Sequence, residues 1–551
     1  MRLRDDCRAL SALVLLLAAA CGGAVSSSSN APVPVPASTS TTARPLPPVP
    51  AVDGPLAVRV TYPGPNQEIT SRDSNFIFGS VGSGRASLTI NGAPARVYPN
   101  GAFIAYVVNP QSSGRYELVA LRGSDSARLM LPVRFRTVRV VSKFELMPAK
   151  PENQPTSRAD TIAALNARVD SLRTLVTRND PIGLVQLGQS SALGDTDRTI
   201  VGRPIAGGTY KWFFLPGTVV PVVERVGNSA RVRLDRDLDV WVDTADAQPV
   251  AAGTVAPARV VSNMRTRGGA NGVDVIIPVG ARPPYLVEEA DRAIVLTLYG
   301  TRANTDIVNY GTGDSLVRVI EWSQERVDRA RITVRLRAAP YGYLVAWENN
   351  ALVLRLRGRP AIDERRPLAG LRLVVDPGHP PIGATGPTGL REAQATLLVG
   401  LRLRELLQER GATVVMTRTE DVPVELGLRP IIARRANAHA FVSVHYNAYG
   451  DGTNPFLASG TGTYFFRAHS QPLAREVQRS LVAQIGLVDL GINYDNLAVT
   501  RPTWYPAILT EGAFMMLPDQ EAAMRTPEFQ DRYARGIADG LESYFRALPA
   551  R

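Results

Sequence analysis

The last third of the chain alternates short apolar runs with segments in which apolar residues recur every three or four positions. The first pattern is typical of buried strands and the second of amphipathic helices. The expected strands cover residues 371–375, 413–417, 440–444, 463–466 and 507–510, and the expected helices cover about 391–410, 425–437, 470–486 and 527–546. This order predicts an α/β domain over residues 368–549, with helices flanking a twisted sheet.

Several small all-β modules are expected upstream of this domain. Residues 55–140 contain short strand-like runs separated by turn residues. The dipeptide Asn91-Gly92 lies between two such runs and is a strong signal for a β-hairpin. These features predict a sandwich of the immunoglobulin type, because such sandwiches are built from short strands at regular spacing.

Two further strand-rich segments follow. In residues 181–250, the run that begins at Asp239 resembles the closing strand of bacterial SH3-like modules. In residues 256–360, the runs at 273–279 and 293–299 resemble those of the AMIN domain. A generic β-sandwich or barrel is the alternative for both segments.

Residues 141–180 are expected to form a linker that contains one amphipathic helix. Five apolar residues follow one another at steps of three and four, namely Ile162, Leu165, Val169, Leu172 and Val176. The pattern covers about two heptads, which is too short for a coiled coil, so the helix is expected to pack on a neighbouring element.

The N-terminus has the pattern of a secretory signal. Residues 1–20 comprise a basic segment, an apolar stretch and small residues. The run 18–21 resembles a bacterial lipoprotein processing box, in which Cys21 becomes the first mature residue and carries acyl chains. This implies a periplasmic protein of the cell envelope, anchored to the outer membrane through a lipid on Cys21. Simple cleavage of the signal is the alternative. Residues 21–54 are rich in Pro, Ser and Thr and are expected to form an extended linker.

Composition narrows the range of partners. Hydrophobic residues make up 45% of the chain and charged residues 20%, which excludes a chain that is disordered throughout. The net charge is +12, but no block of lysine and arginine stands out, so nucleic acid is not an expected partner. The chain has 2 cysteines, which argues against thiolate zinc sites and a disulfide framework. No apolar run reaches the length of a membrane span.

All four histidines of the chain lie in the last domain, at His379, His439, His445 and His469. His379 and His445 stand at the ends of expected strands, where functional sites of α/β sheets form. If these strands are parallel neighbours, the two rings lie at one edge of the sheet. Glu392 completes a His2Glu set, which suits zinc and leaves a fourth position for water. Stabilisation of the helix N-terminus is the alternative role of Glu392. His439 and His469 are interpreted as structural or surface residues.

Glu511 ends the apolar run of the last expected strand. A charge at the mouth of a buried strand is costly unless it has a role or a partner. A general base beside a metal-activated water is one such role. A hydrogen-bonded carboxylate that caps a loop is the alternative.

Four motifs resemble those of the zinc-dependent N-acetylmuramoyl-L-alanine amidases: Asp-Pro-Gly-His at 376–379, Gly-x-x-Glu at 389–392, Ser-Val-His-x-Asn at 443–447 and Pro-Ala-Ile-Leu-Thr-Glu at 506–511. The resemblance covers about a third of the chain. It implies that His379, Glu392 and His445 hold one zinc ion, with Glu511 as the catalytic acid/base. It also implies hydrolysis of the amide between N-acetylmuramic acid and L-alanine in peptidoglycan.

Two alternative functions stay open. The same ligand set could belong to a zinc peptidase that cuts the stem peptides of peptidoglycan. The protein could instead be a non-catalytic, peptidoglycan-binding envelope lipoprotein, since β modules and a linker suit such a role. The expected partners are peptidoglycan and, through Cys21, the membrane; the sequence indicates no particular regulatory protein.

Overall fold

The computed structural model describes residues 44–135, 180–188, 199–381 and 383–549. The expected signal segment, Cys21 and the helix expected at 157–178 lie outside these residues, so they stay predictions. Among the helices of the described ranges, none is both long enough and apolar enough to cross a bilayer.

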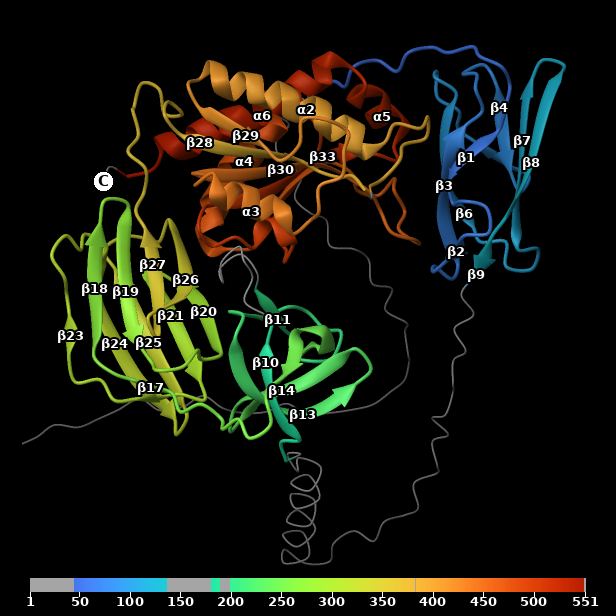
Figure 1. Cartoon of the computed structure of the whole chain (residues 1–551). Coiled ribbons are helices and arrows are strands. Elements are labelled where there is room, and N and C mark those ends of the chain that lie inside the picture. Colours follow the sequence, from blue (N-terminus) through green and yellow to red (C-terminus); the bar gives the residue numbers. More distant parts are fainter. Residues whose placement is uncertain (1–43, 136–179, 189–198, 382, 550–551) are drawn as a thin grey trace, which may run out of the picture. The chain divides into compact units, whose positions relative to one another are not determined.

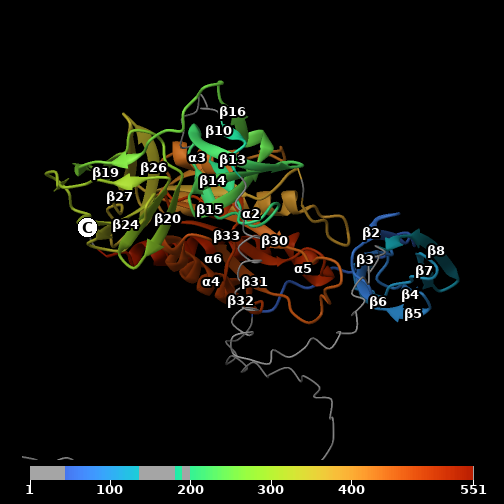
Figure 2. The same cartoon turned by 90° about the horizontal axis from the view of Figure 1, so that it is seen from below.

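The C-terminal region contains a six-stranded sheet with the order β29-β28-β30-β33-β31-β32. Figure 1 labels β28, β29, β30 and β33 of this sheet, and Figure 2 labels β31 and β32. Its strands are β28 (Arg372–Pro377), β29 (Thr413–Met416), β30 (Ala440–Asn447), β31 (Thr461–Phe465), β32 (Asp489–Tyr494) and β33 (Ala507–Phe514). Strands β29, β28, β30 and β33 are mutually parallel, β31 is antiparallel to β33, and β32 is parallel to β31. The carboxyl ends of β28, β30 and β33 therefore lie together, and we call this the carboxyl edge of the sheet.

Helices cover both faces of this sheet. They are α2 (Glu392–Glu409), α3 (Leu428–Arg435), α4 (Gln471–Ile485), α5 (Pro518–Met524) and α6 (Pro527–Arg546). Because side chains alternate along a strand, Val442 and Val444 of β30 share a core with α2, α4 and α6, whereas Phe441 shares one with α3. Helices α4 and α6 lie side by side (Figure 2), since Gly536 and Gly540 of α6 leave room for α4.

The five strands and four helices predicted for this region are confirmed, with ends shifted by a few residues. Helix α3 is shorter than the predicted 425–437. Strand β32 and helix α5 were not predicted. β32 is an edge strand of mixed composition interrupted by Gly491, so it lacks a clear alternation. α5 spans only 7 residues, too few to show a helical period.

Residues 59–135 form two antiparallel sheets and one short parallel pair of strands, with a shared apolar core that includes Ile77, Phe103 and Leu118. The sheets contain β1 (Arg59–Tyr62), β3 (Ser74–Ser80) and β6 (Ala102–Val108), and β4 (Ser87–Ile90), β5 (Ala93–Ala95), β7 (Arg115–Arg122) and β8 (Asp125–Pro132), with β2 (Glu68–Ile69) and β9 (Arg134–Phe135) as a further pair. The hairpin predicted at Asn91-Gly92 is confirmed: it joins β4 to β5, and φ is 49° and 79° at the two residues.

Residues 183–188 and 199–249 form a second region, which consists mostly of β-strands. Its strands are β10 (Gly183–Leu187), β11 (Ile200–Gly202), β12 (Trp212–Phe214), β13 (Thr218–Val226), β14 (Ser229–Asp235), β15 (Leu238–Asp243) and β16 (Ala247–Pro249). Five of them form the sheet β15-β14-β13-β10-β16, and β11 pairs with β12. Alternate residues of these strands, such as Val232 and Val240, are fully buried.

Residues 260–357 form a third all-β region. It contains β17 (Val260–Val261), β18 (Met264–Gly269), β19 (Gly272–Pro278), β20 (Tyr285–Ala290), β21 (Ala293–Tyr299), β22 (Arg302–Ala303), β23 (Val308–Asn309), β24 (Val317–Arg326), β25 (Arg329–Leu336), β26 (Gly342–Glu348) and β27 (Ala351–Arg357). The sheets β23-β18-β19-β27-β26 and β20-β21-β25-β24 share one core. The immunoglobulin-like, SH3-like and AMIN-like assignments of the three β regions stay predictions.

Candidate metal centre

His379 and His445 meet at the carboxyl edge of the sheet. His379 follows β28 and His445 lies near the end of β30, and the parallel pairing of these strands sets the two residues side by side. Their ring centroids are 4.8 Å apart. Gly378 makes this approach possible, because a Cβ atom at that position would overlap the ring of His445. The sequence analysis made this proximity conditional on the two strands being parallel neighbours, and they are.

Glu392, the first residue of α2, places its carboxylate between the two rings. Its Oε2 lies 3.1 Å from Nε2 of His379, and its Oε1 lies 3.1 Å from Nδ1 of His445. The same oxygens accept backbone hydrogen bonds from Ala384 and Tyr446. With its side chain 4% exposed, the carboxylate is fixed in one orientation by four neighbours.

These three residues form a possible metal-binding triad. One ligand atom from each of His379, Glu392 and His445 can be chosen so that all lie within 4.8 Å of one another. Two imidazole nitrogens and one carboxylate oxygen are the ligand types that zinc accepts in catalytic sites. The rings keep 25% and 17% of their surface exposed, so the site is open to solvent on one side.

Glu511 lies on the strand next to His445. β30 and β33 are parallel neighbours, and their register pairs His445 with Glu511. Paired residues of neighbouring strands project to the same face. Oε2 of Glu511 is buried and has no hydrogen-bond partner among the described residues. A buried carboxylate oxygen without a partner is costly, and it fits a group that receives a proton or faces a cation.

The two glutamates differ in their electrostatics. Burial alone would raise the pKa of Glu392, but hydrogen bonds and charge from His379 and His445 outweigh it and hold the pKa well below its usual range. Burial raises the pKa of Glu511 well above its ordinary value, and the nearby charge of Glu392 raises it further. The site therefore contains one carboxylate suited to ligation and one suited to carrying a proton.

Two residues that the sequence analysis did not identify support the site through hydrogen bonds to its main chain. The hydroxyl oxygen of Tyr533 lies 2.9 Å from the carbonyl oxygens of His445 and Thr510, which ties the ends of β30 and β33 to α6. The fully buried Glu521 of α5 accepts hydrogen bonds from the backbone of Thr388 and Leu390, in the loop before α2. The sequence signal for Tyr533 was its place on the apolar face of α6. No signal pointed to Glu521, because α5 is too short to show a helical period.

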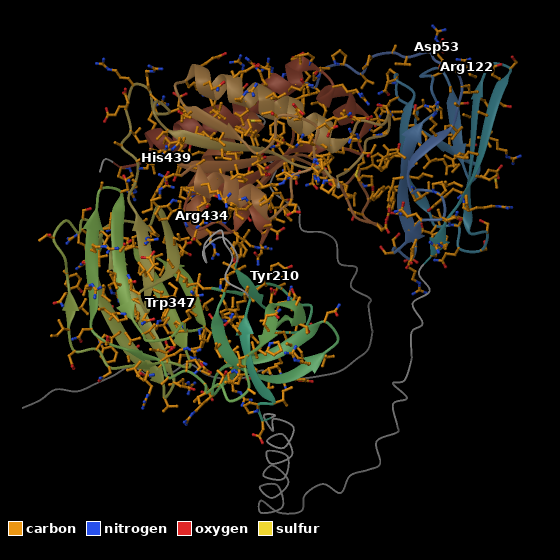
Figure 3. All side chains as sticks on the ribbon, in the orientation of Figure 1. Asp53, Arg122, Tyr210, Trp347, Arg434 and His439 are labelled. Carbon is orange, nitrogen blue, oxygen red and sulfur yellow. The ribbon has the colours of Figure 1, made fainter. Side chains whose placement is uncertain are left out.

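The other two histidines lie apart from the triad. His439, labelled in Figure 3, precedes β30 and thus stands at the opposite end of that strand from His445. Its Nδ1 accepts a hydrogen bond of 2.8 Å from the backbone N–H of Arg372. His469 is buried at the start of α4, with Nε2 3.4 Å from the carbonyl oxygen of Tyr505. Both contacts fit the structural roles predicted for these residues.

Comparison with known proteins agrees with this geometry. A family model described as N-acetylmuramoyl-L-alanine amidase matches residues 373–543. The probable cell wall amidase LytH of Staphylococcus aureus is 30% identical over 210 residues, which is 37% of this chain and 68% of LytH. The chain belongs to the N-acetylmuramoyl-L-alanine amidase family. Its amidase region, residues 373–543, contains all four predicted site residues.

Other relatives match about a third of the chain. The amidase LytC of Bacillus subtilis is 31% identical over 188 residues, which is 33% of this chain and 37% of LytC. The crystal structure of an N-acetylmuramoyl-L-alanine amidase from Clostridium difficile 630 is 30% identical, with a TM-score of 0.31, and matches 33% of this chain and 98% of that one. The catalytic domain of CwlV from Bacillus (Paenibacillus) polymyxa is 34% identical, with a TM-score of 0.30, over 32% of this chain and 97% of that one.

Proposed function

We propose that this protein is a zinc-dependent hydrolase of peptidoglycan that cleaves the amide between N-acetylmuramic acid and L-alanine. The observation that carries the proposal is the position of Glu511. It pairs with His445 on the neighbouring strand, and the charge of Glu392 helps to raise its pKa. A binding module has no need of both a metal-ligand triad and a buried carboxylate of raised pKa. A hydrolase needs both.

The residues present fit a zinc ion. His379, Glu392 and His445 would hold it, and three protein ligands leave a position for water or substrate, as catalytic zinc sites require. The unpartnered Oε2 of Glu511 is the second point of fit, because a cation nearby would offset the cost of its burial. Bound zinc supplies a Lewis acid that activates water and polarises an amide carbonyl.

Glu511 moves the proton in the proposed reaction. It takes a proton from the attacking water as the new carbon–oxygen bond forms at the lactyl carbonyl of the muramic acid. It then gives that proton to the nitrogen of L-alanine as the carbon–nitrogen bond breaks. The products are a carboxylic acid on the sugar and a free amine on the peptide, and no covalent intermediate with the enzyme is needed.

We further propose that the protein works in the cell envelope. The name of LytH, a probable cell wall amidase, supports a site of action at the cell wall. A lipid on Cys21 would anchor the protein to the outer membrane, with its domains in the periplasm. The β regions would position the enzyme on peptidoglycan. Replacement of Cys21 by Ser tests the anchor: the variant should leave the membrane fraction, and unchanged fractionation would contradict it.

The reaction is tested by digestion of purified peptidoglycan with the full chain, followed by mass spectrometry. Peptide-free glycan together with intact stem peptides is the expected result. Cut stem peptides would instead identify the zinc peptidase alternative, and undigested wall would leave a non-catalytic binder. Treatment with a chelator should stop the reaction and added zinc should restore it, while metal analysis of the purified protein identifies the ion.

A further inference from the structure

Two buried arginines surround the turn that presents His379. Arg418 follows β29 and Arg429 is the second residue of α3, and the two residues are 4% and 3% exposed. Four consecutive carbonyl oxygens, those of residues 377–380, each accept a hydrogen bond from one or both guanidinium groups. These contacts involve neither the side chains of the metal-ligand triad nor Glu511, so the roles proposed for those residues do not explain them.

Arg429 holds the His379 turn itself. Its Nη2 donates to the carbonyl oxygen of His379 at 3.1 Å, and its Nη1 donates to Asp376 Oδ1 at 2.7 Å. His379 has φ of 58°, a left-handed conformation that is unfavourable for a residue with a Cβ atom. Arg429 also donates to the carbonyl oxygens of Pro377 and Pro380, on either side of His379 in the chain. These hydrogen bonds stabilise that conformation, so Arg429 fixes the direction of one candidate ligand.

Arg418 connects two segments that each carry a candidate ligand. Its Nε and Nη2 donate to the carbonyl oxygens of Pro377, at 2.9 Å, and Gly378, at 2.8 Å, just before His379. The same Nη2 lies 2.6 Å from the carbonyl oxygen of Ala393 and 3.1 Å from Oγ1 of Thr396, in the first turn of α2. One planar group thus spans the turn that ends in His379 and the helix that begins with Glu392.

This placement is electrostatically costly. Burial and the like charge of Arg429 together lower the pKa of Arg418 to about 10. Among the described residues, the hydrogen bonds of Arg418 all run to uncharged oxygens, whereas Arg429 has the carboxylate of Asp376 as a partner. The nearby charges of Asp421 and Asp376 offset only part of this cost, and no carboxylate accepts a hydrogen bond from Arg418 among the described residues. The hydrogen bonds instead join the His379 turn to the start of α2, which argues for a role tied to the site.

We propose that Arg418 is a positioning residue that sets the spacing between His379 and Glu392 and so determines how tightly the triad binds its metal ion. The inference rests on the proposed zinc site and deepens it. Arg418 touches neither ligand side chain, and it acts through the main chain of both segments. Residues that orient metal ligands typically contribute a factor of about 10–100 to metal affinity.

The test compares zinc affinity of the full chain in three variants, measured by competition with a chelating indicator. Arg418→Met removes all the hydrogen bonds and should lower zinc affinity by about 10- to 100-fold. Arg418→Lys keeps the charge but cannot span both segments, so a smaller loss is expected. Arg410→Met is the matched control: Arg410 ties the end of α2 to Asp539 and Glu542 of α6, away from the carboxyl edge.

Cobalt substituted for zinc supplies a second measurement, because its visible absorption reports ligand geometry. The Arg418 variants should shift the cobalt spectrum, and the Arg410 variant should keep both the wild-type spectrum and a zinc affinity within twofold of wild type. Melting temperatures of the metal-free proteins separate loss of stability from loss of affinity.

Zinc affinity within twofold of wild type and an unchanged spectrum in Arg418→Met would overturn the inference while leaving the proposed function intact. If that variant does not fold, Arg418→Lys is judged by the same criterion, and failure of both to fold would assign Arg418 to general stability and also overturn it. A wild-type protein that binds no zinc would overturn the proposed function and this inference together.

Discussion

The two ends of strand β30 carry the same kind of side chain in opposite settings. At the amino end, His439 accepts a backbone hydrogen bond from Arg372 and lies apart from the triad. At the carboxyl end, His445 shares the carboxylate of Glu392 with a second histidine. In a parallel sheet, the strands are followed at their carboxyl ends by loops and helix starts that bring further polar groups. The end of the strand, more than the residue type, decides which histidine becomes a candidate ligand.

The largest effect is expected at the carboxyl end, from Glu511→Gln. Gln has nearly the same shape but cannot carry the proton, so turnover of peptidoglycan should fall by about 1,000-fold or more. Zinc content should stay at the wild-type level, since Glu511 is not one of the triad residues. Turnover and metal content are measured on the same preparation. Near-normal turnover would remove Glu511 from the mechanism.

The next effect contrasts His445 of β30 with His439, which precedes that strand. His445→Ala should lower zinc affinity by about 100-fold or more, because it removes one of three candidate ligands. His439→Ala should leave zinc affinity within about twofold of wild type, because its ring lies outside the triad. Equilibrium dialysis with zinc checks both variants. Equal losses in the two would break the comparison between the strand ends.

The pH dependence of stability should reflect the titration of His439, at the amino end of β30. Burial lowers the pKa of His439 from 6.5 to about 4, so between these values the unfolded chain binds the proton more tightly. The contribution of neutral His439 is therefore complete above about pH 6.5 and is lost as the pH falls towards 4.

His439→Asn is the matched variant for this measurement, since an amide oxygen can accept the hydrogen bond of Arg372 but does not titrate. Urea unfolding of both metal-free proteins should give a free energy of unfolding that falls more steeply in the wild type between pH 6.5 and 4. Parallel curves for the two proteins would show that His439 titrates normally.

The smallest effect is expected on stability alone, at a residue that has no proposed role in the reaction. Thr526 caps α6, and its side chain accepts a hydrogen bond of 3.2 Å from the backbone N–H of Phe529. Thr526→Ala should lower the free energy of unfolding by about 1 kcal/mol, as measured by urea denaturation. Zinc affinity should not change, and a parallel loss of both would mean that the cap also supports the carboxyl edge.

Sequence patterns were enough to predict the candidate site but not its supports. The apolar runs that end near His379, His445 and Glu511 predicted strands, and the confirmed parallel pairing brings the first two together. The register that sets Glu511 opposite His445 depends on strand order, which local patterns do not specify. Arg418 and Tyr533 contact main-chain oxygens far along the chain, so nothing near them in the sequence indicates their roles.

The glycine at position 378 has a consequence for how the metal centre could be lost. Its α-carbon faces the His445 ring so closely that a single added methyl group would have to displace the imidazole or the turn. A Gly378→Ala protein would thus retain His379, Glu392 and His445 and still lose the close approach of the two imidazoles. The geometry of the triad can therefore be lost without mutation of any candidate ligand, and an intact set of ligand motifs is no guarantee of a working centre.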